Sequence, residues 1–232
     1  MSDYERYGDY NNIEDDEPRS KSPVMLILKI LTAVVCITVV GILAFRLIVF
    51  NKYPASVSGL YFDDALTEYY KEMGDKADIK TQKLRYIYDD PEVGNFFCDY
   101  LYVIEDIDQL QITVRYNTST VTRISEELGV ELDADDFSIF EYRLADNYGK
   151  EQGRLVDTVT ESQAMYRYVK LVFEGVSFSP DGGEAPEWIR LETTVRGTEN
   201  AYTYNLIYEN HADYNTFEKY IPTKKELEAV EG

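Results

Sequence analysis

The chain has 232 residues, of which 44% are hydrophobic and 14% aromatic, and its formal net charge is −20. This length allows one full-sized domain with its own core in addition to a tail and a membrane anchor. The acidic balance argues against nucleic-acid binding, because proteins bind phosphates through clustered Lys and Arg side chains that displace counterions.

Residues 1–22 are predicted to be a disordered acidic tail. They hold seven acidic and three basic residues and almost no aliphatic ones, so they cannot bury enough apolar surface to fold. Tyr4, Tyr7 and Tyr10 recur every three residues among the acids. They could form a docking or phosphorylation strip, or simply belong to a solvated tail.

Residues 23–50 are predicted to be one transmembrane helix. The run 24–50 reads VMLILKILTAVVCITVVGILAFRLIVF, and at about 1.5 Å per residue it exceeds the roughly 30 Å of a hydrocarbon layer. Lys29 and Arg46 lie near its two ends, where long side chains can reach the headgroups. The alternative is that this charge pair marks a contact with a partner helix or an ion path. We expect residues 24–50 to lie in the lipid bilayer.

The segment is too long, and its leader too acidic, for a cleaved signal peptide. Arg19, Lys21 and Lys29 lie on its N-terminal side, against Arg46 and Lys52 on the other. This bias favours a cytoplasmic N-terminus. We therefore expect a single-pass plasma-membrane protein with residues 51–59 as a linker and 60–232 as an extracytoplasmic β-rich domain.

The first predicted element of that domain is a helix over 63–73. Asp63 can cap its start and Gly74 can end it. The apolar residues recur at steps of three and four, as on one helix face: Ala65, Leu66, Tyr69, Tyr70 and Met73.

Beyond this helix the hydrophobic period becomes two residues, which is typical of strands. In 110–117, Leu110, Ile112 and Val114 point one way while Gln111 and Thr113 point the other. This pattern predicts a strand with one buried face. Strands are predicted near 81–88, 96–105, 109–117, 137–145, 165–178, 187–196 and 201–209, with a weaker candidate at 154–160.

The last two strands are predicted to form a hairpin across a loop that contains Gly197 and Asn200. Two short helices are also expected. One is an apolar stripe over 121–128 that Gly129 closes, and the other begins at a capping box formed by Thr223 and Glu226.

These elements favour a mainly β fold, an antiparallel β-sandwich with short flanking helices after the transmembrane helix. The alternative is an α+β sheet covered by the helix at 63–73. The runs FEYRLADNYG (140–149) and YVKLVFEGV (168–176) resemble strand-and-turn patterns of immunoglobulin-like envelope domains of bacterial membrane-anchored proteins. The resemblance covers roughly residues 95–210, implies an immunoglobulin-like sandwich, and carries no catalytic residues across.

Few residues suit catalysis or metal binding. His211 is the single histidine, so a Ser-His-Asp or Cys-His mechanism would have to use it, and zinc would find only Cys98 as a thiol in the domain. Asp133, Asp135 and Asp136 resemble the opening of a calcium loop but lack its glycine and closing glutamate, which leaves a weak metal candidate. No cofactor is expected.

Tyrosine, at 21 residues, is the most notable component of the composition. Rings on predicted strands pack well on a half-buried face, and Trp188 is expected to be a core residue. If a row of rings is exposed, it would form a stacking surface for a ligand. The candidate ligand-binding residues are Tyr166, Tyr168, Tyr202 and Tyr204.

Three functions remain open at this point. The first is a non-catalytic extracytoplasmic domain that binds an envelope protein or a surface ligand. The second is an envelope hydrolase that uses a carboxylate pair or His211. The third is an accessory subunit of a membrane complex that is contacted through the tail and the charged residues of the helix.

Overall fold

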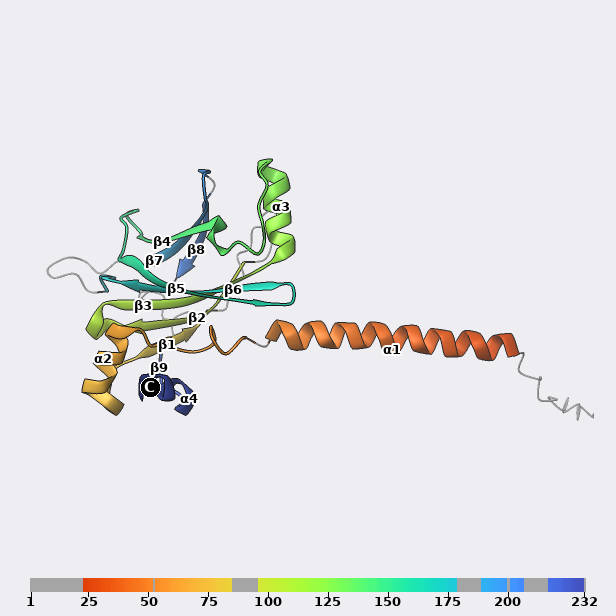
Figure 1. Ribbon diagram of the computed structural model, residues 1–232, viewed down its shortest axis with the longest axis horizontal. Coiled ribbons are helices and arrows are strands. Elements are labelled where there is room, and N and C mark those ends of the chain that lie inside the picture. The colour runs from red at the N-terminus through yellow and green to blue at the C-terminus, as the bar shows by residue number, and fades with distance from the viewer. Residues whose placement is uncertain are drawn as a thin grey trace, which may run out of the picture. The chain divides into compact units, whose positions relative to one another are not determined.

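The computed structural model describes residues 23–51, 53–84, 96–178, 189–199, 201–206 and 217–231 (Figure 1). The chain divides into two compact units, Met1–Asn51 and Lys52–Gly232. The predicted acidic tail with Tyr4, Tyr7 and Tyr10 lies outside the described residues, as do Trp188 and His211.

The first unit contains one helix, α1 (Pro23–Asn51). Its segment Pro23–Ile48 has a mean hydropathy of 2.7 and is long and apolar enough to cross a membrane. The hydroxyls of Thr32 and Thr38 donate to the carbonyls of Leu28 and Val34, each at 2.9 Å. The helix thus satisfies these polar groups internally, as a lipid environment requires.

The second unit is built on a six-stranded antiparallel sheet in the order β5-β6-β3-β2-β1-β9. Its strands are β1 (Lys80–Lys83), β2 (Phe97–Ile104), β3 (Gln109–Asn117), β5 (Arg154–Gln163), β6 (Tyr166–Glu174) and β9 (Glu218–Lys219). The segment predicted as the weaker strand candidate is β5, one of the longest in the sheet. The two-residue β9 was not predicted, because so short a strand forms only where another strand is placed to pair with it.

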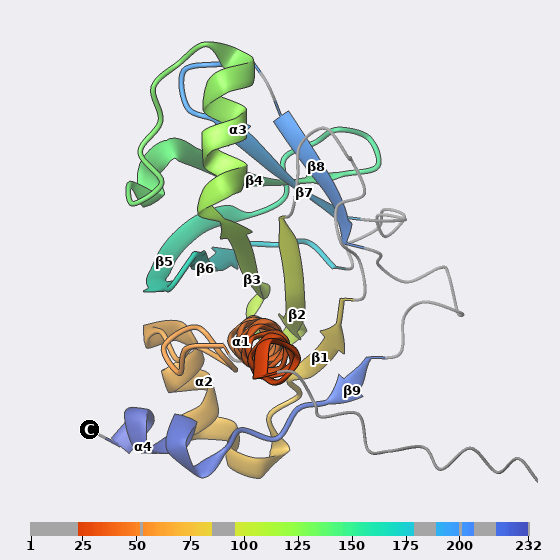
Figure 2. The same cartoon turned by 90° about the vertical axis from the view of Figure 1, so that its right-hand side faces the viewer.

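A three-stranded antiparallel sheet, in the order β4-β7-β8, lies over one face of the larger sheet (Figure 2). It comprises β4 (Phe140–Asp146), β7 (Ile189–Val195) and β8 (Ala201–Leu206), and β7 pairs with β8 as the predicted hairpin requires. Both sheets contribute to one hydrophobic core, whose members include Ile112, Tyr116, Phe140, Leu144 and Leu191. The domain is therefore mainly antiparallel sheet.

Helix α2 (Asp64–Met73) lies on the opposite face of the larger sheet, where the α+β alternative expected a covering helix (Figures 1 and 2). The carboxylate of Asp63 accepts from the Leu66 N–H at 2.8 Å, and Gly74 ends the helix with a φ of 53°. Leu66 is fully buried against Tyr102 and Ile104 of β2. The predicted helix and both of its ends are confirmed.

Two further helices also match their predicted signals. Helix α3 (Thr118–Leu128) buries Val121 and Ile124 and ends at Gly129 with a φ of 64°. Helix α4 (Lys224–Glu231) follows the predicted capping box. Three short 3₁₀ turns complete the described helical elements, at Gly74–Lys76, Glu105–Ile107 and Phe137–Ile139.

The polar face of β3 differs from the prediction. Its alternation is as expected, but both of its faces are buried: Gln109 and Gln111 are 0% exposed, and Thr113 and Arg115 are 3% exposed. A strap formed by residues 53–63 lies against this face. The sequence pattern could not indicate this, because alternation separates two faces without telling what covers the polar one.

Side-chain hydrogen bonds hold the strap on the sheet. The Gln111 amide pairs with both the N–H and the C=O of Tyr61, at 2.9 and 2.7 Å. The Thr113 hydroxyl donates to the Val57 carbonyl at 3.0 Å, and the buried ammonium of Lys170 donates to the Gly59 carbonyl. Of the segment predicted as a linker, 51–59, residue 51 ends α1 and the described residues 53–59 belong to the strap.

Candidate functional site

The C-terminal segment 217–226 lines both cavities that we consider as sites. One lies where this segment pairs with β1, and the other lies between this segment and the strap. The strap precedes α2, near the start of the domain, so the second cavity joins two regions that are distant in sequence. Leu60 and Glu226, which meet there, are 166 residues apart.

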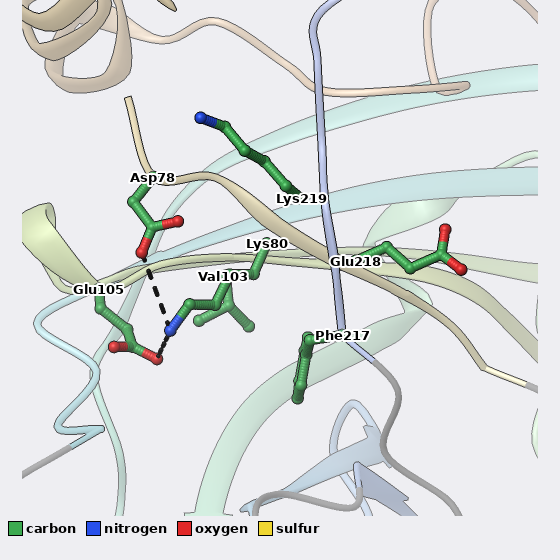
Figure 3. A pocket seen from close by; sticks show the side chains of 7 residues that line it. All are labelled: Asp78, Lys80, Val103, Glu105, Phe217, Glu218 and Lys219. Carbon is green, nitrogen blue, oxygen red and sulfur yellow. Dashed lines mark hydrogen bonds and ion pairs between the residues drawn. The ribbon is translucent and has the colours of Figure 1, made fainter. Parts of the chain in front are cut away.

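The cavity at β1 and β9 has a volume of about 270 Å³ and is rich in charge (Figure 3). The Lys80 ammonium lies 2.8 Å from a Glu105 oxygen and 3.9 Å from an Asp78 oxygen. Figure 3 shows Glu218 pointing away from this group, and the Lys219 ammonium donates to the Asp75 carbonyl at 3.4 Å. A glycosidase needs two carboxylates that face each other across the substrate bond, whereas here Lys80 bridges the two carboxylates. The arrangement is an ion cluster that joins β1 to the end of β2.

The second cavity, about 490 Å³, lies between residues 55–62 of the strap and residues 220–226. Its volume is typical of a small-molecule site. Tyr61, Phe62 and Tyr220 contribute aromatic surface, and Ser56, Ser58 and Thr223 contribute hydroxyls. Such a mixture of rings and hydroxyls suits a ligand that has both apolar and polar parts.

Glu226 fastens the two walls of this cavity together. One carboxylate oxygen accepts from the Leu60 N–H and from the Tyr220 hydroxyl, both at 2.7 Å. The other accepts from the Thr223 N–H at 2.6 Å and from its hydroxyl at 2.7 Å. A carboxylate has about four acceptor positions, so these bonds leave Glu226 little capacity to bind a ligand.

The tyrosine hydroxyls at the cavity remain protonated donors. A hydrogen bond to Asp157, together with burial, raises the pKa of Tyr61 to about 12. Burial and the bond to Glu226 raise the pKa of Tyr220 further above its ordinary value. Both shifts have the same origin, since a nearby carboxylate and a low dielectric disfavour a phenolate.

Lys225 is the other ionic residue that lines the cavity. Neither its ammonium nor the Ser58 hydroxyl forms a hydrogen bond or ion pair with any residue that the structure describes. The Ser56 hydroxyl, by contrast, donates to Glu161 at 3.0 Å. Lys225 and Ser58 are therefore the polar groups that this cavity can offer to a ligand.

The predicted ligand-binding tyrosines do not gather at either cavity. Tyr168 is 0% exposed and packs edge-on against Tyr53, with 5.2 Å between ring centroids, so its ring cannot join an exposed stacking surface. Tyr166 is partly buried, and its ring centroid lies 5.3 Å from the guanidinium carbon of Arg115. The same guanidinium also lies over the rings of Tyr53 and Phe97. Tyr202 and Tyr204 lie on β8, and their side chains are outside the described residues.

The weak metal candidate at Asp133, Asp135 and Asp136 is engaged in local bonds. Asp133 accepts from the Asp135 N–H at 2.9 Å, and Asp135 forms an ion pair with Arg167. Hydrogen bonds from Ser138 lower the pKa of Asp136. Within the described ranges, no group of three or more His, Cys, Asp or Glu side chains is placed to hold a metal ion.

The two cysteines lie in different units: Cys36 is on α1, and Cys98 is buried in the sheet domain. The sequence had signalled Glu226 only as a capping residue, and nothing local to it or to Ser58 indicated a shared cavity.

No family model matches this chain, and no curated protein or solved structure matches it either.

Proposed function

We propose that this chain is a single-pass membrane protein whose folded domain binds an envelope protein or a surface ligand outside the cytoplasm, without catalysing a reaction. The observation that carries the proposal is the junction between helix and domain. One residue, Lys52, separates the last residue of α1 from Tyr53, where the strap begins. A protein that must act at the membrane surface needs such a tether.

The strap adds to this argument because it is integral to the domain. Val57 is 1% exposed and Leu60 is 5% exposed, and the buried polar groups of β3 and β6 bind the strap backbone. Six residues of extended chain span about 20 Å at most, so Val57 stays within that distance of Asn51. The tether therefore restricts the domain to the membrane surface.

The orientation and the fold family belong to the same proposal. The surplus of Arg and Lys on the N-terminal side of the helix favours a domain on the outside. An immunoglobulin-like relationship is consistent with two antiparallel sheets around one core, and it remains part of the proposal. A non-catalytic role is supported by three carboxylates at the two cavities: Asp78 and Glu105 pair with Lys80, and Glu226 accepts internal hydrogen bonds.

Cysteine labelling tests the orientation. Tyr148 is 71% exposed in the turn after β4, so a Tyr148→Cys chain should react with a membrane-impermeant maleimide on intact cells. The unsubstituted chain is the control, because Cys98 is buried and Cys36 lies on the apolar helix. Labelling that requires permeabilised cells would place the domain in the cytoplasm.

Crosslinking tests the binding role. A photoreactive amino acid at position 148 or 130, both exposed, should give a discrete adduct in cells that excess purified domain competes away. Turnover of a glycan or peptide by the purified chain, lost on substitution of a single carboxylate, would instead support the hydrolase hypothesis.

A further inference from the structure

The cavity between the strap and the C-terminal segment lies close, along the chain, to the proposed membrane anchor. Ala55, which lines it, is four residues after Asn51. Four residues of extended chain span about 14 Å at most. If the helix is embedded, this wall of the cavity remains near the lipid headgroups whatever the orientation of the domain.

The electrostatic character of this cavity differs from that of the domain as a whole. The chain carries 43 acidic residues against 23 basic ones. Among the residues that the structure describes, Lys225 and Glu226 are the ionic side chains that line the cavity. Both oxygens of Glu226 accept hydrogen bonds, from the strap, from Tyr220 and from Thr223. Glu226 keeps its negative charge, but its oxygens are already occupied, so the Lys225 ammonium is the charged group at this cavity that has donors available for a ligand. A free ammonium donor favours a ligand with an anionic oxygen.

The residues around Lys225 offer a ligand both a hydrogen-bond donor and an apolar surface. The Ser58 hydroxyl, without a partner among the described residues, faces the same cavity. Ile221 is 77% exposed, and Lys219 and Lys224 on the same segment are also exposed. An exposed apolar side chain flanked by lysines suits the boundary between headgroups and acyl chains.

We propose that this cavity binds the phosphate-bearing headgroup of an anionic membrane lipid. The Lys225 ammonium pairs with the phosphate, since an ammonium forms a charge-assisted hydrogen bond with a phosphate oxygen. Ser58 donates a second bond, and Ile221 contacts the lipid beside the headgroup. This inference rests on the proposed membrane tether and assigns a ligand class to the domain.

The test uses the full chain in neutral, uncharged detergent and three probes: short-chain phosphatidylglycerol, glycerol 3-phosphate and inorganic phosphate. Binding is followed by calorimetry and by hydrogen exchange of residues 55–62 and 220–226. We expect the lipid to bind and to protect both segments. The variant Lys225→Glu should weaken its affinity by about tenfold or more, because it replaces an attraction with a repulsion.

The matched control is Lys71→Glu, which makes the same charge change at an exposed lysine of α2 and should leave the affinity unchanged. An equal loss in both variants would show nonspecific attraction and overturn the proposal. Equal binding of inorganic phosphate or glycerol 3-phosphate would identify a soluble phosphate as the ligand and overturn the lipid assignment. Binding of none of the three probes would exclude the site.

The tether is tested separately by a carbonate wash of membranes. Both the parent chain and Lys225→Glu should remain in the membrane fraction, because α1 rather than the cavity holds the chain there. Release of the parent chain would contradict the proposed function, whereas retention of both chains without lipid binding would contradict only this inference.

Discussion

Glu226 illustrates how one side chain can serve two levels of structure. Within its own helix it forms a capping box with Thr223, and across the domain it accepts from the Leu60 N–H and the Tyr220 hydroxyl. Hydrogen bonds to a charged group each contribute about 1.5–3 kcal/mol. The strap and the C-terminal segment are thus held together chiefly through one carboxylate.

A substitution at Gly59 tests the contact between the strap and Glu226. The φ of Gly59 is +83°, and a Cβ at this position would lie 2.2 Å from a Glu226 oxygen. Gly59→Ala should therefore lower the free energy of unfolding by more than the roughly 1–2 kcal/mol that a left-handed backbone costs any alanine. Thermal unfolding of the full chain, with and without the substitution, measures this loss of stability.

The matched control for this prediction is Gly149→Ala, since Gly149 has a φ of +75° with nothing within 4 Å of the added Cβ. It should show the cost of the backbone conformation alone. Equal losses in the two variants would mean that the contact with Glu226 contributes nothing.

The environment of Asp146, the last residue of β4, predicts that the stability of the domain depends on pH. Asp146 is 4% exposed, and burial by itself would raise its pKa. Hydrogen bonds from the Lys150 N–H, the Gln152 amide and the Tyr148 N–H outweigh burial and lower the pKa. Because the folded pKa lies below the unfolded value of about 3.9, the ionised group stabilises the fold above that pH, and this stabilisation is lost on acidification.

Asp146→Asn should accordingly destabilise the domain at neutral pH by about 1–3 kcal/mol. The difference from the parent chain should shrink as the pH falls below the ordinary carboxyl pKa. Urea unfolding at several pH values measures this, with Asp75→Asn, the same substitution at an exposed position, as the control for the loss of one surface charge. A difference that stays constant with pH would contradict the prediction.

At the scale of elements, the strap 53–63 decides whether the polar face of the larger sheet is buried or exposed to solvent. It covers the polar face of β3, where its backbone carbonyls accept from Gln111 and Thr113 and the Asp63 carboxylate accepts from Gln109, so that these side chains are buried with hydrogen-bond partners. Buried polar groups are tolerated in a core only when they are paired. The strap therefore belongs to the fold as fully as a strand does.

Gln111→Leu tests the strap. Leucine keeps the bulk of the side chain but leaves the Tyr61 N–H and C=O without their partner, and unpaired buried groups cost about 1–3 kcal/mol each. We expect a clear loss of thermal stability and faster hydrogen exchange at residues 57–63. Gln163→Leu, in the edge strand β5, is the control, because the Gln163 side-chain oxygen has no partner among the described residues.

At the scale of the whole molecule, the described residues form a membrane-compatible helix and a domain with its own hydrophobic clusters. We expect residues 52–232 alone to fold, to remain in the supernatant after ultracentrifugation and to unfold cooperatively. A chain that begins at residue 64 lacks the strap and should fail to fold, since Gln111, Thr113 and the Lys170 ammonium lose the hydrogen bonds that they form with the strap backbone. A stable fold of the shorter chain would show that the strap is dispensable.

Local chemistry along the chain was sufficient to predict most elements. The apolar run identified α1 from solvent preference alone, Asp63 with Gly74 and Thr223 with Glu226 marked helix ends, and the period of two located most strands. These features depend on neighbouring residues, so one sequence suffices to detect them. The burial of Tyr168, one of the candidate ligand-binding tyrosines, could not be foreseen, because periodicity places rings on a face without telling whether that face is covered.

By itself the sequence determined that this protein has one membrane-compatible helix and a mainly antiparallel domain, because solvent preference and backbone period are local properties. Only the tertiary structure decided that the connector is a strap, that the polar face of β3 is interior, and that Ser58, Lys225 and Glu226 share a cavity. These contacts join residues that are 50 and 166 positions apart in the chain, and they depend on how the layers pack, which no local pattern specifies.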